Sequence, residues 1–107
     1  MSQSVPSDVV VVGGGLAGLS AATFTARHGL DTLVLDAGGS LLRRNAHLEN
    51  FPGFPAGVNP RQLLDLLGEQ AETAGAERLT ATVRQVERSD DGFRVETEAG
   101  DAVLTEY

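Results

Sequence analysis

The sequence predicts an α/β fold that begins with a strand, a helix and a second parallel strand and ends in an antiparallel meander. Three observations support this prediction. A run of valines at residues 9–12 leads through glycines into a helical pattern of small and apolar residues. A second apolar run, at residues 33–35, ends in Asp36. From residue 76 onward the hydrophobic period changes to two, which is typical of strands.

The turn after the valine run contains the pattern G-x-G-x-x-G at Gly13, Gly15 and Gly18. Gly13 is expected to make the tight turn, Gly15 to let a pyrophosphate approach the backbone, and Gly18 to let helix and strand pack closely. A helix beginning near Leu16 would stabilise that anion through its unpaired N–H groups and its dipole. The pattern predicts a Rossmann-like dinucleotide site, the alternative being a turn that only connects strand to helix.

Asp36 is the candidate ligand of a ribose. It follows the last glycine at close to the expected spacing of about 20 residues. A carboxylate in this place accepts hydrogen bonds from a ribose diol and repels a phosphate on the 2′-oxygen. The residues therefore favour FAD or NAD over NADP.

Later segments predict a loop, a helix and strands. Residues 37–59 are rich in turn formers, and their apolar residues favour packing over a ligand or a neighbouring domain. Asn59 and Pro60 predict a helix start, and the leucine stripe that follows is expected to end at Gly75. Gly68, inside this helix, would permit close packing. A short third parallel strand is expected at residues 76–80, and the meander at 81–88, 93–98 and 101–106.

Length and composition narrow the classes of protein. The 107 residues suit a single modest core, with residues 1–7 as a flexible N-terminus. There are no cysteines, and no apolar stretch approaches the length of a membrane span. A net charge of −7 disfavours nucleic acid as a partner. A cytoplasmic protein that binds neither nucleic acid nor membranes is the expectation.

Two further motifs point to a family. Gly38-Gly39-Ser40-Leu41 follows the second strand, and Glu49-Asn50-Phe51-Pro52-Gly53-Phe54-Pro55 lies further along the loop. Together with residues 9–36, they make nearly the whole chain resemble the N-terminal half of the FAD domain of thioredoxin-reductase-like, FAD-dependent pyridine nucleotide-disulfide oxidoreductases. The resemblance implies a three-layer FAD/NAD(P)-binding fold and FAD as the cofactor.

The resemblance also implies roles for single residues. Gly13, Gly15, Leu16 and Ala17 would line the pyrophosphate, and Asp36, where the family commonly has glutamate, would hold the adenosine ribose. The remaining cofactor-binding candidates lie after the second strand and in the meander. They are Ala37, Gly39 and Ser40, Asn50 toward the flavin, and the backbone of Val83 near the adenine.

Other polar residues give weaker signals. Arg43 or Arg44 would suit a diphosphate oxygen, the alternative being an exposed loop cation. His28 and His47 lack a carboxylate cluster at ligand spacing, so no metal site is expected. No residue stands out as a general acid or base, and we name no catalytic residue.

Relative to the resembling family, the chain is expected to be incomplete. It lacks the catalytic cysteine pair, and a separate domain or protein would bring NADH or NADPH. The family's next parallel strand would lie beside residues 9–12, so we expect that edge to be covered by self-association or by the C-terminal segment. An FAD-binding module of a flavin-dependent oxidoreductase is the first interpretation. The alternative is a non-catalytic FAD, NAD or adenine nucleotide binding or regulatory protein.

The acidic, lysine-free composition gives a first testable prediction. All eight basic residues are arginine, and both adaptation to a salt-rich cytoplasm and a genome bias explain this. Circular dichroism during dilution of potassium chloride separates the two. Loss of structure at low salt is expected of a halophilic protein, and an unchanged spectrum contradicts that explanation.

Overall fold

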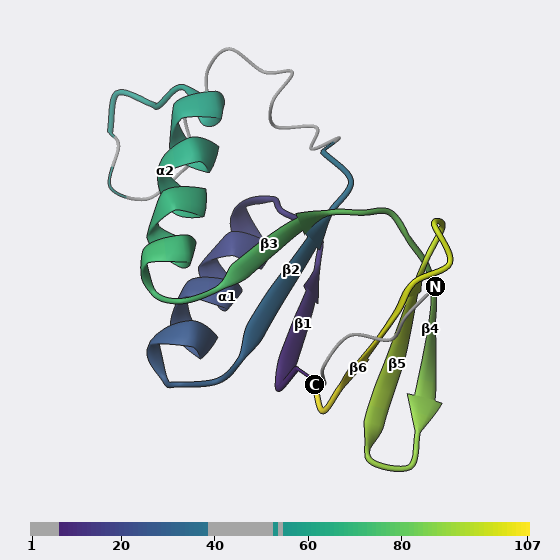
Figure 1. Cartoon of the computed structure of the whole chain (residues 1–107). Helices are drawn as coiled ribbons and strands as arrows, with labels where there is room; N and C mark the ends of the chain where they lie inside the picture. The colour runs from purple at the N-terminus through teal and green to yellow at the C-terminus, as the bar shows by residue number, and fades with distance from the viewer. Residues whose placement is uncertain (1–6, 39–52, 54) are drawn as a thin grey trace.

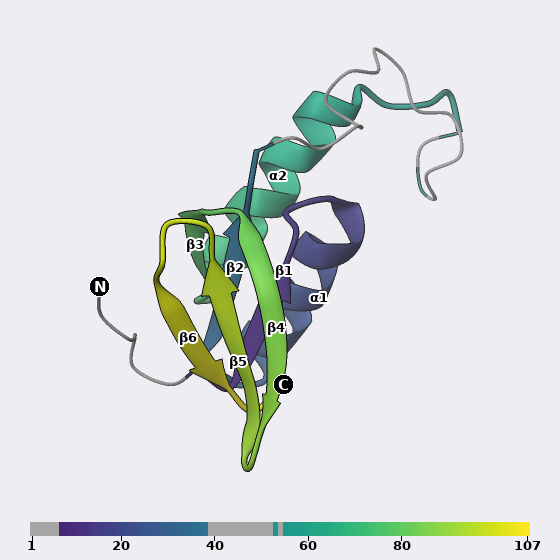
Figure 2. The ribbon, with the colours of Figure 1, turned by 90° about the vertical axis from the view of Figure 1, so that its right-hand side faces the viewer.

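The computed structural model of this chain describes residues 7–38, 53 and 55–107. These residues form three layers, with two helices on one face of a parallel sheet and an antiparallel sheet on the other (Figures 1 and 2). The elements in chain order are β1 (Val9–Val12), α1 (Leu16–Arg27), β2 (Thr32–Asp36), α2 (Pro60–Thr73), β3 (Glu77–Thr80), β4 (Val83–Ser89), β5 (Gly92–Thr97) and β6 (Ala102–Thr105). The predicted α/β fold is confirmed.

The parallel sheet has the order β1-β2-β3, so β2 is its central strand. Val12 pairs with Leu35, and Asp36 pairs with Thr80. All three strands run in the same direction, which brings their carboxyl ends to one edge of the sheet. The predicted third parallel strand is confirmed, although it begins at Glu77 and not at residue 76.

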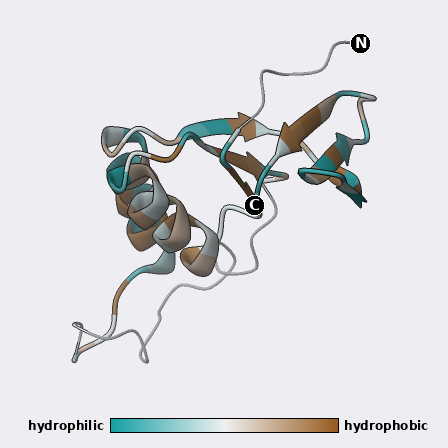
Figure 3. Ribbon diagram, turned by 90° about the horizontal axis from the view of Figure 1, so that it is seen from below, coloured by the Kyte–Doolittle hydropathy of each residue, from teal (hydrophilic) through white to brown (hydrophobic). Residues whose placement is uncertain are grey.

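Alternation along β2 divides the core in two. Val34 packs with Leu19 and Leu64 between the sheet and the helices. Leu33 and Leu35 point to the opposite face, where they pack with residues of the antiparallel sheet. Successive strand residues face opposite sides, so a strand buried on both faces must be apolar throughout. Figure 3 shows apolar stretches of the parallel sheet in brown, whereas the start of β3, a strand that is mostly exposed, is hydrophilic.

The start of α1 and both ends of α2 agree with the sequence-based predictions. In α2 the side chain of Asn59 accepts hydrogen bonds from the backbone N–H of Arg61 and Gln62, at 2.9 and 3.4 Å. Gly29 and Gly75 follow α1 and α2 with φ of +81° and +112°, which glycine adopts without strain. Neither helix in the described ranges is long and apolar enough to cross a membrane.

The antiparallel sheet has the order β4-β5-β6, as predicted. In β5, Val95 and Thr97 are buried. Glu96 on the other face forms ion pairs with Arg84 and, at 2.7 Å, with Arg94. The predicted bounds differ from the observed ones by one or two residues: β4 is Val83–Ser89 where 81–88 was predicted, β5 is Gly92–Thr97 where 93–98 was predicted, and β6 is Ala102–Thr105 where 101–106 was predicted. Residues 81 and 82 instead lead the chain from one sheet to the other.

β1 is an edge strand, and the C-terminal residues cover the start of its edge. The N–H of Tyr107 donates to the carbonyl of Asp8, and the N–H of Val10 donates to the carbonyl of Tyr107, both at 3.0 Å. Backbone N–H groups alternate in direction along a strand, so the N–H of Val12 points to the same edge. Val12 lies beyond the reach of this pairing, with its side chain 56% exposed. The expected cover by the C-terminal segment is therefore present at the first half of the edge.

This edge yields a prediction for amide hydrogen exchange. The amide of Val10 is expected to exchange more slowly than that of Val12, because only Val10 has a partner in Tyr107. Removing Glu106 and Tyr107 should speed up exchange at Val10 and leave the central strand residue Val34 protected. Equal exchange at Val10 and Val12 in the full chain would show either that the C-terminal pairing does not form or that another chain covers the whole edge.

Candidate functional site

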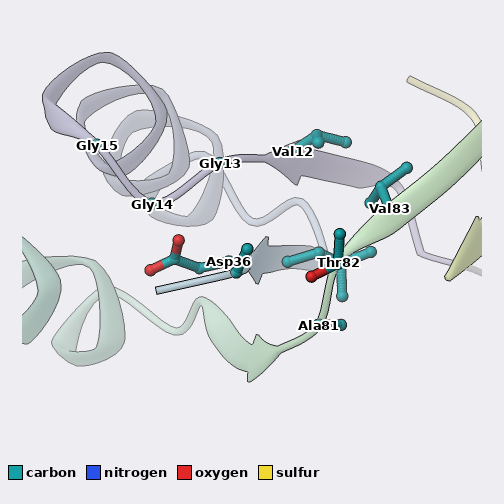
Figure 4. Close-up of a pocket in the computed structure, with 10 residues that line it drawn as sticks. Val12, Gly13, Gly14, Gly15, Asp36, Ala81, Thr82 and Val83 are labelled. Atoms are coloured by element: carbon teal, nitrogen blue, oxygen red, sulfur yellow. The ribbon is translucent and has the colours of Figure 1, made fainter. Parts of the chain in front are cut away.

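A cavity of about 380 Å³ opens at the carboxyl edge of the parallel sheet. The ends of β1 and β2 and the residues that follow β3 contribute to it (Figure 4). In open α/β sheets, ligands bind at this edge. The described residues that line the cavity are Val12, Gly13, Gly14, Gly15, Leu35, Asp36, Ala37, Ala81, Thr82 and Val83.

The glycine turn, residues 13–15, lines this cavity with backbone that carries no side chains. Gly13 has φ of +107°, and its N–H donates to the carbonyl of Leu35 at 2.8 Å, which fixes the turn against β2. A Cβ on Gly13 would meet no atom within 4 Å, so the space beside the turn is open. The turn therefore leaves room for a bulky group to approach the main chain.

Gly18 sets the position of α1 relative to the turn. A Cβ on this residue would overlap the carbonyl oxygen of Gly13 and lie 3.1 Å from Cγ1 of Val11. Only glycine allows the helix to come this close to the strand, which is the predicted role of Gly18. The first turn of α1 contains no acidic residue, so the positive end of the helix is free to attract an anion.

Asp36 contributes the carboxylate of the cavity and is half-buried. Its Oδ1 accepts a hydrogen bond from the N–H of Gly38 at 3.0 Å, and its main-chain carbonyl accepts one from Ala81 at 3.0 Å. In Figure 4 the carboxylate reaches toward Gly14 in the glycine turn. A hydrogen-bond acceptor thus lies beside an anion-binding helix end, which is the arrangement that an adenosine diphosphate group requires.

The structure brings five of the predicted cofactor residues together at the cavity: Gly13, Gly15, Asp36, Ala37 and Val83. The others in the described ranges are at the start of α1 and do not line it. Leu16 packs against the core, Ala17 is exposed, and Gly18 faces the strand. Four predicted residues, Gly39, Ser40, Arg44 and Asn50, lie outside the described residues.

Five lining residues were missed by the sequence analysis. Val12 ends β1 and Leu35 directly precedes the last residue of β2, so both lie next to predicted residues, and Gly14 is the first variable position of the glycine motif. Ala81 and Thr82 directly follow β3. The sequence could have predicted Ala81 and Thr82 as lining residues, because the residues that follow neighbouring parallel strands meet at the same edge of the sheet.

A second hollow is larger but has the wrong charge for a pyrophosphate. It measures about 660 Å³ and is lined by four carboxylates, those of Asp8, Asp90, Asp91 and Glu106. These groups would repel a dinucleotide. Within the described ranges, no group of three or more histidine, cysteine or acidic residues is arranged to hold a metal ion.

Comparisons with known proteins agree with this geometry. The family model described as an FAD binding domain matches residues 8–101. Thioredoxin reductase from Streptomyces coelicolor is 39% identical over 97 residues, covering 87% of this chain and 30% of the relative. Thioredoxin reductase 1 from Saccharomyces cerevisiae is 34% identical over 101 residues, covering 88% and 32%. A solved thioredoxin reductase from Gloeobacter violaceus superimposes with a TM-score of 0.85 at 32% identity, over 94% of this chain and 32% of that one.

The fold and the cavity thus define a dinucleotide-binding α/β protein. The chain belongs to the FAD binding domain family, with FAD as its cofactor. It corresponds to an N-terminal part of the FAD domain of thioredoxin-reductase-like oxidoreductases, as the resemblance implied. It spans about a third of the length of the relatives that it matches.

The cavity predicts that Asp36→Asn weakens the binding of FAD about tenfold. A hydrogen bond to a charged group contributes about 1.5–3 kcal/mol, and about 1.4 kcal/mol corresponds to a factor of ten. Titration calorimetry measures the change. Asp91→Asn, which removes the same charge from the exposed turn between β4 and β5, is the matched control and should bind as the wild type does. Equal affinities for all three proteins would contradict a role for Asp36.

Proposed function

We propose that the chain is the FAD-binding module of a flavin-dependent oxidoreductase and does not reduce thioredoxin by itself. The observation that supports this most strongly is that one cavity joins the glycine turn, the Asp36 carboxylate and the backbone at Val83. These are the three groups that the adenosine diphosphate half of FAD needs. Residues 1–107 would form one part of a larger FAD domain.

In this proposal, the pyrophosphate, the ribose and the adenine of FAD each bind to a different group of the cavity. The pyrophosphate lies at the glycine turn, where the N-terminus of α1 attracts it without a lysine or arginine. The ribose diol donates hydrogen bonds to Asp36, whose carboxylate disfavours a 2′-phosphate. The adenine lies near the backbone of Val83. Leu16 and Ala17 contribute their N–H groups from the first turn of α1, and Gly18 holds that turn against the strand.

When bound, FAD supplies the redox chemistry, and the protein orients it and excludes competing reactions. Gly39 and Ser40 would approach the cofactor after β2, Arg44 would pair with a diphosphate oxygen, and Asn50 would reach toward the flavin. We assign no catalytic residue to this chain. NADH or NADPH would arrive through a separate domain or protein, and a dithiol would also have to come from elsewhere, because the chain has no cysteine.

A second candidate function is a nucleotide-binding or regulatory protein without turnover. The lining of the cavity favours this candidate in one respect. The groups that line the cavity would bind adenosine diphosphate, a part that FAD shares with NAD and with free adenine nucleotides. Self-association along the open part of the β1 edge and a location in the cytoplasm stay predictions under either function.

Absorbance spectroscopy of the purified protein tests the proposal. A flavin spectrum, present on purification or after addition of FAD, is expected, and NADH or NADPH together with the remaining domains should bleach it under anaerobic conditions. Binding of NAD or an adenine nucleotide without binding of FAD would favour the second candidate. If FAD, NAD and ADP all fail to bind, both functions are wrong.

A further inference from the structure

We propose that Gly14 is a positioning residue for the ribose, because the absence of a side chain at this position lets the Asp36 carboxylate lie against the glycine turn. This inference rests on the proposed function and assigns a role to the first variable position of the G-x-G-x-x-G motif. That position has no steric requirement in the motif itself, whose three fixed glycines are Gly13, Gly15 and Gly18.

The backbone of Gly14 does not adopt a conformation that is reserved for glycine. Its φ lies outside the left-handed region, unlike the φ of +107° at Gly13. An alanine would therefore meet no penalty from a left-handed φ at this position. Backbone geometry does not explain a glycine at this position, so the reason must lie in what surrounds it.

The Asp36 side chain occupies the space that a side chain at Gly14 would need. Gly14 is buried, and a Cβ built on it would lie 2.6 Å from Cγ and 3.0 Å from Cβ of Asp36 and would overlap Oδ2. A methyl group and the carboxylate cannot share this space. Turning the short Asp36 side chain about its Cα–Cβ bond removes the overlap with Cγ and Oδ2, and this rotation carries the whole carboxylate away from the turn.

A hydrogen bond fixes the Asp36 carboxylate in its present orientation. Oδ1 of Asp36 accepts from the N–H of Gly38 at 3.0 Å, which leaves Oδ2 directed at the glycine turn. Turning the side chain would break this bond as well. Gly14 and the Gly38 amide thus hold the carboxylate from two sides, beside the place where the pyrophosphate would lie.

The consequence is a specificity effect that a general loss of stability would not produce. In the wild type, removing the 2′-hydroxyl from the ligand removes a donor to Asp36 and should weaken binding. In Gly14→Ala the carboxylate has moved away, so the same hydroxyl should no longer matter. The proposed role therefore concerns the difference between two ligands and not only the affinity for one of them.

Titration calorimetry with ADP and 2′-deoxy-ADP tests this role. The wild type is expected to bind ADP about tenfold more tightly than the deoxy analogue, the factor that one hydrogen bond to a charged group provides. In Gly14→Ala the ratio should fall to about one, and adding Asp36→Asn to this variant should change little further. A ratio in Gly14→Ala that matches that of the wild type would overturn the proposal.

Gly68→Ala is the matched control. Gly68 also has no left-handed φ, and a Cβ on it would lie 2.9 Å from Cζ of Arg78, a flexible side chain on β3 outside the cavity. This variant meets the same kind of overlap with a charged group, but it should keep the tenfold ratio. If both glycine variants lose the ratio, the effect is a general one and the assignment to Gly14 is wrong.

A measurement without any ligand separates this inference from the proposed function. The amide proton resonance of Gly38 reports its hydrogen bond to Asp36. It is expected to shift in Gly14→Ala and in Asp36→Ala, which removes the acceptor, and to stay in place in Gly68→Ala. An unshifted resonance in Gly14→Ala overturns the inference even if the wild type binds ADP and FAD. Failure of the wild type to bind either ligand overturns the proposed function and with it the role toward the ribose, and a shifted Gly38 resonance would then show only that Gly14 sets the orientation of the Asp36 side chain.

If Gly14→Ala folds poorly, thermal unfolding of the double variant still decides the question. Overlap with the carboxylate predicts that Asp36→Ala restores part of the melting temperature that Gly14→Ala loses, because the atoms nearest the added methyl group are then gone. Additive losses in the double variant would show that Gly14 acts through something other than Asp36 and would overturn the proposal.

Discussion

The close approach of α1 to the carbonyl of Gly13 is the constraint on which the site depends. Because Gly18 has no side chain, the first turn of the helix packs directly on the strand end. This contact fixes the N-terminus of α1 at the carboxyl end of β1, and the pairing of β1 with β2 then brings Asp36 beside it. The turn at the N-terminus of α1 and a carboxylate acceptor thereby lie at one cavity, although they come from different parts of the chain.

The second sheet completes this arrangement. Leu33 and Leu35 of β2 are covered by Val95 and Val103 of the meander, so the central strand is buried on both faces. The connection from β3 to β4 must cross from one sheet to the other, and it does so directly beside Asp36. Residues 81–83 consequently form a wall of the cavity. The connection from β3 to β4 therefore both brings the meander onto the parallel sheet and supplies part of the cavity lining.

Local sequence signals predicted much of this structure. The glycines, the N-cap at Asn59 and the change of hydrophobic period gave the elements and their order, because each is set by nearby residues. What the sequence left open depends on long-range contacts. The cover of the β1 edge was left open between self-association and the C-terminal segment, and the pairing of Tyr107 with β1 joins the two ends of the described chain, which no local pattern predicts. The role of Gly14 appears only when Asp36 is seen to lie over it.

The central claim is that the cavity binds the adenosine diphosphate half of FAD through main-chain N–H groups and one carboxylate. An NMR titration of the labelled protein with ADP tests it most directly, because ADP carries these groups without the flavin. The largest amide shifts are expected at Gly14, Gly15 and Leu16, with further shifts at Ala37 and Val83. Binding that leaves these amides unchanged and perturbs a different surface would contradict the claim.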